Sequence, residues 1–549
     1  MRLSEALLGA LRDQGAGDVF GIPGDFILPF FHAIEHTDIL PLVTLSHEPA
    51  IGFAADAAAR MRRRPSAVAL TYGAGALNAV NAIAGAYAER SPVFVIAGCP
   101  SAAERGSGYL LHHQARTLDS QYRMYAEITC DQGRITDAAS APEVIARLLR
   151  SCRTWSQPVL LELPRDLADL EIGPIPSLPP LSWDDEAVAA CAEDILQQLD
   201  RARSPIMVVD VEIRRYELED RVTELANRLD IPVVTTLMGR GLLTDAPVDF
   251  RGTYLGEAGD PELRSLVEES DGLLLLGAIL SDSNFGPSGR NFDLRKAMLA
   301  SHREVQIGYR SYHDIPLAAL VEALLNRLPA AERKAPPAPS RHQIPGLPRD
   351  EEPLGAGDIA AGVRELLNRH PTPMPIASDI GDCLFSTLEL DHTPLVAPGY
   401  YASMGFGVPA GLGIQIATGE RPLILVGDGA FQMTGWELGN CRRLGLDPVV
   451  ILLNNQSWEM IRVFQPDSQC SHLADWHYAR LANNLGGLGI RVRTRSHFHY
   501  AIQEALTTRG QFVLIEAMLP PGQASPILQR FADTLQGKRQ RAPAGATSG

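Results

Sequence analysis

Hydrophobic residues along this chain fall into short apolar runs that alternate with longer amphipathic segments. Residues 68–71 form one such run, residues 77–88 have helical spacing, and residues 93–97 form the next run. Strands that alternate with helices in this way predict βαβ units and parallel sheets. Some runs, such as LLLL at 273–276, contain no polar position, which is typical of strands buried on both faces.

The same pattern recurs in three regions that are separated by proline-rich stretches. Such stretches behave as semi-rigid spacers, and the polar, glycine-rich end of the chain is typical of disorder. We therefore expect an α/β protein with three domains. The expected domains are 1–170, 185–335 and 355–530, with a linker at 336–354 and a disordered tail at 537–549.

Polar residues follow two apolar runs of the third region. The run at 423–426 ends at GDG (427–429), and the run at 449–453 ends at NN (454–455). The carboxyl ends of parallel strands form the edge at which α/β sheets bind ligands. Glycine lets the backbone approach a ligand closely, a helix amino terminus binds phosphate, and carboxylate and amide oxygens suit Mg²⁺. The pattern therefore predicts a metal-diphosphate site, with a plain strand-turn-helix as the simpler alternative.

Composition and charge narrow the classes of protein. The chain has 549 residues, of which 45% are hydrophobic and 21% charged, so it can form large cores. Its formal net charge of −16 argues against nucleic acids and anionic membrane surfaces as partners. The seven cysteines form no C-x-x-C pair, which is typical of reduced thiols in a cytoplasmic protein. Residues 1–15 resemble an amphipathic helix rather than a signal peptide, and no apolar stretch approaches the ~20 residues of a membrane helix.

Four segments of the first region carry residues that are suited to chemistry. They are GIPGD at 21–25, HE at 47–48, GAG at 73–75 and HHQ at 112–114. Each segment also has a simple structural interpretation. A glutamate at a helix start interacts favourably with the helix dipole, adjacent histidines often lie at the surface, and glycines form turns. From these residues alone, both interpretations stay open.

Taken together, the segments resemble a known family. GDG followed by 24 residues and NN resembles the signature of thiamine diphosphate enzymes. The 2-oxo acid decarboxylases of that family carry segments that resemble GIPGD, HE, A-x-x-E-x-x-P at 86–92 and LLHHQ in this chain. The same likeness extends to GAILSD at 277–282 and GYYASMGFGVPA at 399–410. The likeness covers most of the chain and is nearest to phenylpyruvate and indolepyruvate decarboxylases. It implies three doubly wound parallel-sheet domains. The first would bind the pyrimidine ring of the cofactor, the second would be the central domain, and the third would bind the diphosphate.

The resemblance also implies which residues hold thiamine diphosphate and Mg²⁺. The metal would be bound by Asp428, the side chain of Asn455 and the backbone carbonyl of Ser457, and the diphosphate would supply further oxygen ligands. Met404 stands where the family places a bulky apolar residue under the cofactor, although methionine also packs well in ordinary cores. The residues implied for cofactor binding are Glu48, Thr71, Asp382, Cys383, Ala402, Met404, Gly427, Asp428, Gly429, Ala430, Asn455, Ser457 and Trp458.

Four polar residues are implied as catalytic, namely Asp25, Glu48, His112 and His113. Glu48 would donate a hydrogen bond to a ring nitrogen of the cofactor, a task that suits a partly buried carboxyl with a raised pKa. Asp25 and the two histidines would position the substrate carboxylate and transfer protons. The cofactor itself accepts the electrons that are released when CO₂ leaves.

One position departs from the family pattern. Many members carry a second active-site glutamate a few residues after NN, and the matching position here is Ile461. Glu459 is two residues away, which on a helix is about 200° of rotation, so we expect it to face elsewhere. An apolar residue at 461 suits an aromatic 2-oxo acid better than pyruvate. The expected wall of the substrate pocket consists of Phe385, Met460, Ile461 and Phe464.

We therefore expect a decarboxylase that converts phenylpyruvate or indole-3-pyruvate to the aldehyde and CO₂. A pyruvate-type decarboxylase and a carboligase similar to acetohydroxyacid synthase stay open as alternatives, and benzoylformate decarboxylase fits the histidine pair less well. A non-catalytic cofactor-binding protein is supported only by the missing glutamate. Because family members share each site between subunits, the resemblance also implies a homodimer or homotetramer, with no nucleic-acid or membrane partner.

Overall fold

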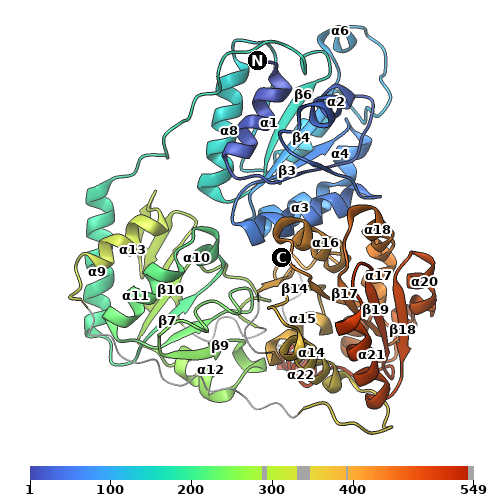
Figure 1. The fold of residues 1–549 in the computed structure, drawn as a ribbon. Coiled ribbons are helices and arrows are strands. Elements are labelled where there is room, and N and C mark those ends of the chain that lie inside the picture. The colour runs from blue at the N-terminus through green and yellow to red at the C-terminus, as the bar shows by residue number, and fades with distance from the viewer. Residues whose placement is uncertain (287–292, 331–345, 391–393, 542–549) are drawn as a thin grey trace.

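The computed structural model describes residues 1–286, 293–330, 346–390 and 394–541, which fold into three α/β domains (Figure 1). The amino-terminal domain lies at the top of the view, the central domain at the lower left and the carboxyl-terminal domain at the lower right. Each domain contains one sheet. The predicted α/β class with three domains is confirmed.

The amino-terminal domain has a six-stranded parallel sheet in the order β2-β1-β3-β4-β6-β5. Alternate residues of its inner strands enter two separate cores, so both faces are buried and these strands are apolar throughout. The strands are β1 (Val19–Gly21), β2 (Leu42–Val43), β3 (Ser66–Leu70), β4 (Val93–Cys99), β5 (Asp131–Arg134) and β6 (Val159–Pro164). The helices are α1 (Leu3–Asp13), α2 (Leu28–Thr37), α3 (Glu48–Arg62), α4 (Ala74–Asn78), α5 (Val80–Ala88), α6 (Ala102–Arg105), α7 (Ser120–Tyr125) and α8 (Ala141–Trp155).

The central domain has a seven-stranded sheet in the order β13-β12-β11-β10-β7-β8-β9. Unlike the predicted all-parallel sheet, β11, β12 and β13 pair antiparallel at one edge. Only His302 and Arg303 separate β11 from β12, and both have positive φ, so the chain reverses in a tight hairpin turn that leaves no room for a crossover helix. The strands are β7 (Pro205–Val209), β8 (Val233–Thr235), β9 (Phe250–Thr253), β10 (Gly272–Leu276), β11 (Met298–Ser301), β12 (Glu304–Ile307) and β13 (Arg310–His313). The helices are α9 (Asp185–Arg201), α10 (Val211–Arg215), α11 (Glu219–Leu229), α12 (Pro261–Glu268) and α13 (Leu317–Leu325).

The carboxyl-terminal domain has a second six-stranded parallel sheet, in the order β15-β14-β16-β17-β19-β18. The strands are β14 (Ile376–Ser378), β15 (Leu395–Val396), β16 (Leu423–Gly427), β17 (Val449–Asn454), β18 (Leu488–Val492) and β19 (Val513–Met518). The helices are α14 (Ala356–Arg369), α15 (Asp382–Ser386), α16 (Gly407–Thr418), α17 (Asp428–Thr434), α18 (Cys441–Leu444), α19 (Glu459–Phe464), α20 (Tyr478–Asn484), α21 (Arg495–Thr507) and α22 (Pro526–Arg541).

Helix α3 of the amino-terminal domain packs closely on helix α16 of the carboxyl-terminal domain (Figure 1). Small residues line both helices at the contact. A Cβ atom built on Gly413 would lie 2.1 Å from the carbonyl oxygen of Ala54, so the two backbones nearly touch. Residues of both helices and of both sheets belong to a single hydrophobic core. The first and third domains therefore form one packed unit.

We expect Gly413→Ala to lower the free energy of unfolding by about 2–3 kcal/mol, because the added methyl group must push two packed helices apart. Chemical denaturation followed by circular dichroism measures this loss. Gly357→Ala is the matched control, since Gly357 lies in α14 and a Cβ built there meets no atom within 4 Å. Equal stabilities of the two variants would contradict a tight helix crossing.

The predicted linker differs from the structure near its end. Its residues 336–345 lie outside the described part of the chain. Leu347 and Leu354 are buried in the core of the carboxyl-terminal domain. The end of the predicted linker is therefore packed as part of that domain, because its two leucines bury apolar area there.

The predicted disordered tail also needs a correction. Helix α22 continues to Arg541, so residues 537–541 are helical. Glutamine, lysine and arginine are good helix formers, and here they extend a helix that is already anchored by Phe531. Residues 542–549 lie outside the described residues.

Two findings bear on the environment of the protein. No helix in the described ranges is both long enough and apolar enough to cross a membrane. All seven cysteines are free.

Candidate active site

The carboxyl ends of β16 and β17 lie side by side and bring GDG and NN together. Gly427 is the register partner of Leu453. The Asp428 carboxylate accepts hydrogen bonds from the backbone N–H of Gly429 at 2.8 Å and of Gln456 at 2.6 Å. The side chain is almost fully buried, and this burial raises its pKa to about 6. A cation bound beside it would favour the ionised carboxylate.

The two asparagines after β17 are placed differently. Asn454 is fully buried, and its amide donates to Glu516 at 2.7 Å. Asn455 accepts the N–H of Ser457 on its Oδ1 at 3.1 Å. The hydroxyl of Ser457 is buried without a hydrogen-bond partner. Asp428, Asn455 and Ser457 therefore lie in one cluster, whereas Asn454 supports the strand from inside the domain.

The turn between β16 and α17 has open space on one side only. A Cβ atom on Gly427 would meet no atom within 4 Å, whereas one on Gly429 would lie 2.6 Å from the ring of Trp458. Trp458 thus packs directly on the turn, and Ala430 is buried behind it. Gly427, at the open side, directly precedes Asp428 in the chain. A ligand can approach the backbone closely there.

The residues around Asp428 fit a divalent cation that is held jointly with a diphosphate. Within the described residues, no group of three or more His, Cys, Asp or Glu side chains could hold a metal ion by itself. Mg²⁺ is commonly bound by one or two carboxylates, while phosphate oxygens and water complete its shell. One carboxylate from Asp428 with the amide oxygen of Asn455 is consistent with such a site.

The segment 398–406 has a strained backbone. We call it the cofactor loop because Ala402 and Met404 are predicted from the sequence to contact the cofactor. Ala402 has a φ of +62°, which is uncommon for alanine. Immediately after the loop, the N–H of Gly407 donates to the buried carboxylate of Asp379 at 2.8 Å. Met404 is half-buried and packs on the core shared by the two domains. Strain of this kind persists only where the surroundings fix it, and it is frequent at ligand sites.

Asp382 and Cys383 form the start of α15. One carboxylate oxygen of Asp382 accepts the N–H of Ser525 at 2.8 Å, and the other is buried without a partner. Burial raises the pKa of this carboxyl to about 6. Cys383 belongs to the hydrophobic core of the domain. Asp382 therefore has an oxygen left for a ligand, whereas the Cys383 thiol is a packing group.

Asp25, His112 and His113 gather around Phe26 in the amino-terminal domain. The Asp25 carboxylate lies 2.7 Å from Nε2 of His112 and 3.8 Å from the guanidinium of Arg165. The rings of His112 and His113 lie 4.8 Å and 6.1 Å from the ring of Phe26. An acid, two imidazoles and a cation thus form one cluster.

The turn after β3 anchors the second histidine. Gly73 has a φ of +59°, and a Cβ atom there would lie 1.9 Å from the carbonyl oxygen of His113. Nδ1 of His113 in turn lies 3.1 Å from the carbonyl oxygen of Tyr72. Only glycine fits at position 73, because both the conformation and the close approach exclude a side chain.

Glu48 is the first residue of α3, and its side chain faces the same turn. Asn78 donates a hydrogen bond to Oε2 of Glu48 at 2.7 Å. A Cβ atom on Gly75 would lie 3.5 Å from Oε1 of Glu48 and 2.9 Å from the side chain of Thr71, whose hydroxyl is buried without a partner. Oε2 of Glu48 thus accepts from Asn78, whereas Oε1 faces Gly75.

The residues of the expected substrate pocket fall into two groups. Phe385 and Met460 belong to one buried cluster with α22. Ile461 is 49% exposed in the single chain, and Phe464, at the end of α19, is half-buried. Glu459 is buried and accepts a backbone N–H at 3.4 Å. Glu459 and Ile461 therefore face different surroundings, one inside the domain and one at its surface.

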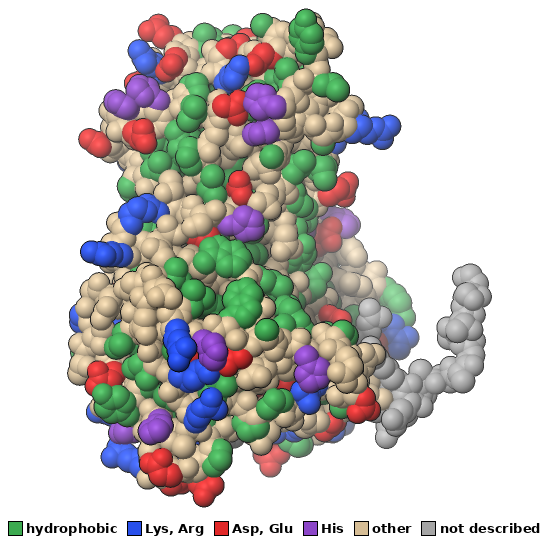
Figure 2. All heavy atoms as spheres, turned by 90° about the vertical axis from the view of Figure 1, so that its right-hand side faces the viewer, with side chains coloured by type: hydrophobic (Ala, Val, Ile, Leu, Met, Phe, Trp, Pro, Cys, Tyr) green, Lys and Arg blue, Asp and Glu red, His purple; other side chains and the backbone are tan. Residues whose placement is uncertain are grey.

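The two polar clusters have no direct polar contact. In the described ranges, no hydrogen bond or ion pair joins Asp25 or Glu48 to Asp428, although Ser46 donates its N–H to Glu437 at 2.9 Å. Figure 2 shows hydrophobic side chains gathered in the middle of the face on which α4, α18 and α20 lie. Large exposed hydrophobic residues of the carboxyl-terminal domain include Met433, Trp436 and Trp476.

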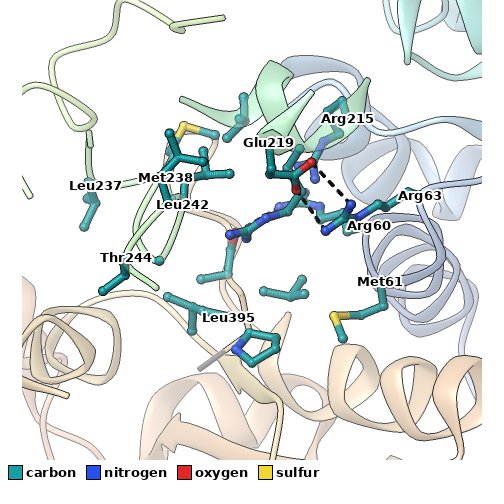
Figure 3. Close-up of a pocket in the computed structure, with 18 of the residues that line it drawn as sticks. Arg60, Met61, Arg63, Arg215, Glu219, Leu237, Met238, Leu242, Thr244 and Leu395 are labelled. Carbon is teal, nitrogen blue, oxygen red and sulfur yellow. Dashed lines mark hydrogen bonds and ion pairs between the residues drawn. The ribbon is translucent and has the colours of Figure 1, made fainter. Parts of the chain in front are cut away.

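A cavity of about 430 Å³ lies where the three domains meet (Figure 3). Arg60 and Met61 reach it from α3, while Met238 and Leu242 come from the central domain and Leu395 from the carboxyl-terminal domain. None of the residues predicted for the active site lines this cavity. The two polar clusters therefore lie outside it.

Three residues of the clusters were not predicted from the sequence, namely Arg165, Asp379 and Asn78. Asp379 follows β14 and Arg165 follows β6, just as Asp428 follows β16. The same strand-end rule would have found both of them. Asn78 has no comparable signal, because its role comes from the hydrogen bond to Glu48.

Family models cover most of the chain. The amino-terminal thiamine pyrophosphate-binding domain of thiamine pyrophosphate enzymes matches residues 1–124, the central domain matches 192–328, and the carboxyl-terminal thiamine pyrophosphate-binding domain matches 379–517. The chain therefore belongs to the thiamine pyrophosphate enzyme family.

Within that family, the chain is similar to decarboxylases along its whole length. It is 55% identical to an indole-3-pyruvate decarboxylase of Azospirillum brasilense over 541 residues, which are 98% of this chain and 99% of that protein. It is 28% identical to an alpha-keto-acid decarboxylase of Mycobacterium ulcerans, with 97% and 96% of the two chains covered. A pyruvate decarboxylase of Hanseniaspora uvarum is also 28% identical, with 94% and 96% covered.

Proposed function

We propose that this protein is a thiamine pyrophosphate-dependent decarboxylase that converts an aromatic 2-oxo acid, indole-3-pyruvate or phenylpyruvate, to the aldehyde and CO₂. The observation that carries the proposal is the presence of two polar clusters, around Asp428 and around Asp25 and Glu48. The 55% identity to an indole-3-pyruvate decarboxylase supports the aromatic substrate. A protein that only kept the fold would need neither cluster.

In this proposal, Asp428, Asn455 and Ser457 hold Mg²⁺ and the diphosphate. The open side of Gly427 admits phosphate groups close to the backbone. Ala402 and Met404 support the ring part of the cofactor from the cofactor loop. When bound, thiamine pyrophosphate supplies the electron sink that allows CO₂ to leave. The contribution of the protein is position and proton transfer.

Glu48 and the Asp25 cluster handle protons. Glu48 donates a hydrogen bond from its Oε1 side toward a ring nitrogen of the cofactor, while its Oε2 accepts from Asn78. The Asp25 carboxylate lies 2.7 Å from Nε2 of His112, with Arg165 close by. This pair, with His113, can bind the substrate carboxylate and return a proton to the product carbon.

Changing Ile461 to Glu is expected to lower kcat/KM for indole-3-pyruvate relative to pyruvate by about tenfold or more, because a charged group replaces an apolar wall. Steady-state rates of CO₂ release with both substrates measure the ratio. Ile461→Leu is the control, since it keeps the wall apolar. An unchanged ratio in the glutamate variant would place residue 461 outside the pocket.

The proposed reaction is tested by aldehyde release from the purified protein with Mg²⁺ and thiamine pyrophosphate. Phenylpyruvate, indole-3-pyruvate, pyruvate and benzoylformate are compared, with a cofactor-free control. We expect cofactor-dependent turnover that favours the two aromatic pyruvates. Turnover of pyruvate alone would contradict the aromatic pocket, a hydroxyketone product would indicate a carboligase, and cofactor binding without turnover would indicate a non-catalytic protein.

The proposal includes a homodimer or homotetramer in which two subunits share each site. The exposed hydrophobic side chains of the carboxyl-terminal domain support it. A Glu48→Gln protein mixed with an Asp428→Ala protein is then expected to regain about a quarter of wild-type activity, because half of randomly formed symmetric dimers contain one intact site. No recovery, with subunit exchange demonstrated, would contradict shared sites.

A cytoplasmic location completes the proposal, without nucleic-acid or membrane partners. The free cysteines are typical of a reducing compartment. The net charge of −16 disfavours anionic surfaces.

A further inference from the structure

The turn at residues 71–75, which we call the glycine turn, contacts both Glu48 and His113. A Cβ atom on Gly75 would lie 3.5 Å from Oε1 of Glu48, and one on Gly73 would lie 1.9 Å from the carbonyl oxygen of His113. The turn therefore sets the spacing between the two residues. A small shift of its backbone changes the relative positions of an acid and an imidazole that are both proposed to act in catalysis.

Gln121, in α7, binds the backbone of the glycine turn. Its Oε1 accepts the N–H of Gly73 at 2.8 Å, and its Nε2 donates to a carboxylate oxygen of Glu162 at 2.9 Å. The side chains of Gln121 and Glu162 are both buried. A buried N–H that loses its acceptor is costly, so the amide of Gln121 holds Gly73 in place.

Glu162 determines which way this amide faces. An ionised carboxylate only accepts hydrogen bonds, so the NH₂ group of Gln121 must face it, and the amide oxygen is left for Gly73. The other oxygen of Glu162 accepts from Nε of Arg134, its register partner on β5, at 2.6 Å. Burial raises the pKa of the Glu162 carboxyl, and the guanidinium of Arg134 opposes that rise. Arg134 thereby favours the acceptor-only form on which the orientation depends.

Two contacts that do not involve Gln121 hold the backbone on either side of Gly73. The hydroxyl of Tyr72 donates to a backbone carbonyl oxygen just before α7 at 3.1 Å. The hydroxyl of Tyr125 donates to the carbonyl oxygen of Ala76 at 2.7 Å. A change at Gln121 is therefore expected to loosen one point of the turn while the domain stays folded.

We propose that Gln121 and Glu162 are positioning residues of the decarboxylase site, which fix the glycine turn and thereby the placement of His113 relative to Glu48. Glu162 lies within β6 and acts through Gln121. The inference rests on the proposed function, because that function gives His113 and Glu48 their roles in proton transfer. The groups around Asp428 are not part of this arrangement, so the pair is expected to affect turnover and to leave cofactor binding unchanged.

Glu162→Gln tests the orientation of the amide. The glutamine at position 162 must turn its oxygen toward Arg134, so its NH₂ group faces Gln121. The Gln121 amide then reverses and presents its own NH₂ group to the N–H of Gly73, which loses its acceptor. We expect kcat to fall by about tenfold to a hundredfold, in line with one unpaired buried donor, and hydrogen exchange of residues 71–75 to become faster. Cofactor affinity, measured by fluorescence titration with thiamine pyrophosphate and Mg²⁺, is expected to match the wild type.

Exchanging the two side chains is expected to restore the site. In the double variant Gln121→Glu with Glu162→Gln, the glutamine donates to the new carboxylate and keeps its own oxygen toward Arg134. The carboxylate still has an oxygen for the N–H of Gly73. Composition and net charge are those of the wild type, so we expect kcat and hydrogen exchange to return to within a few-fold of wild-type values.

Asp131→Asn is the matched control for Glu162→Gln. Asp131 lies on the adjacent strand β5, pairs with Arg147 and accepts a hydrogen bond from Ser151 at 2.8 Å. The change removes the same charge beside an arginine, and neither of these partners belongs to the glycine turn. We expect wild-type kcat and wild-type hydrogen exchange of residues 71–75 in this variant.

Equal kcat of Glu162→Gln and Asp131→Asn would overturn the proposal, and so would a folded double variant that stays as slow as Glu162→Gln. If Glu162→Gln does not fold, Gln121→Met replaces it, because methionine has a similar length but only a weak acceptor for the N–H of Gly73. Wild-type kcat in that variant overturns the proposal. A wild-type protein that binds thiamine pyrophosphate but releases no aldehyde would contradict the decarboxylase, and hydrogen exchange in the same variants would still decide whether the pair fixes the turn.

Discussion

The Asp428→Ala variant is expected to bind thiamine pyrophosphate at least about a hundredfold more weakly in the presence of Mg²⁺, and to show no measurable turnover. Loss of a residue that merely supports a metal ligand already costs roughly 10–100-fold in affinity, and Asp428 supplies the one carboxylate of its cluster. Without it, the ion has only neutral oxygens from the protein. Fluorescence titration with the cofactor measures the change.

The control for this variant is Asp475→Ala. Asp475 lies near the same strand end, where it pairs with Arg491 at 2.7 Å and accepts a weak contact from Asn454 at 3.4 Å. Its loss changes the charge by the same amount without removing an oxygen from the Asp428 cluster. Wild-type cofactor affinity is therefore expected for Asp475→Ala. Retained affinity in Asp428→Ala would refute the proposed metal site.

Glu48→Gln is expected to lower kcat by about 10²–10⁴-fold while cofactor affinity changes little, because a positioned acid contributes this much to proton transfer. Glutamine keeps the size of the side chain and an oxygen for Asn78, but it has no acidic proton to place on the Oε1 side. Single-turnover rates with saturating cofactor measure the chemical step.

A graded control comes from Asn78→Ala. That change removes the hydrogen bond to Oε2 and leaves the acid in place, so the carboxyl group is no longer held in one orientation. A smaller loss, about tenfold, is expected, in line with one neutral hydrogen bond. A Glu48→Gln rate within a few-fold of the wild type would show that another group acts as the acid.

Much of the fold follows from local pattern. The apolar runs at 68–71, 93–97 and 273–276 are strands because both of their sides are buried. The segment 77–88 was predicted as one helix, but the chain forms α4 and α5 with a break at Ala79. The antiparallel edge of the central sheet was missed, because it depends on positive φ at His302 and Arg303, a conformation that is uncommon for residues other than glycine.

The candidate site is predictable where residues follow strands and unpredictable where partners are distant in sequence. Asp428 and Asn455 could be placed together from the parallel order of two strands. Gln121 carried no signal in the sequence, since its partners Gly73 and Glu162 lie 48 and 41 residues away along the chain. Such pairings arise from domain packing, which hydrophobic periodicity does not encode.

The close crossing of α3 and α16 has a consequence for biosynthesis. Helix α3 is made first, and α16 follows roughly 350 residues later, which at ordinary rates of translation is about 20–70 s. During this interval the alanine face of α3 has no partner within its own chain. Contacts between such distant segments form slowly, and exposed apolar surface favours aggregation. We therefore expect the unfinished chain to be more prone to aggregation than the complete protein until the last domain is made.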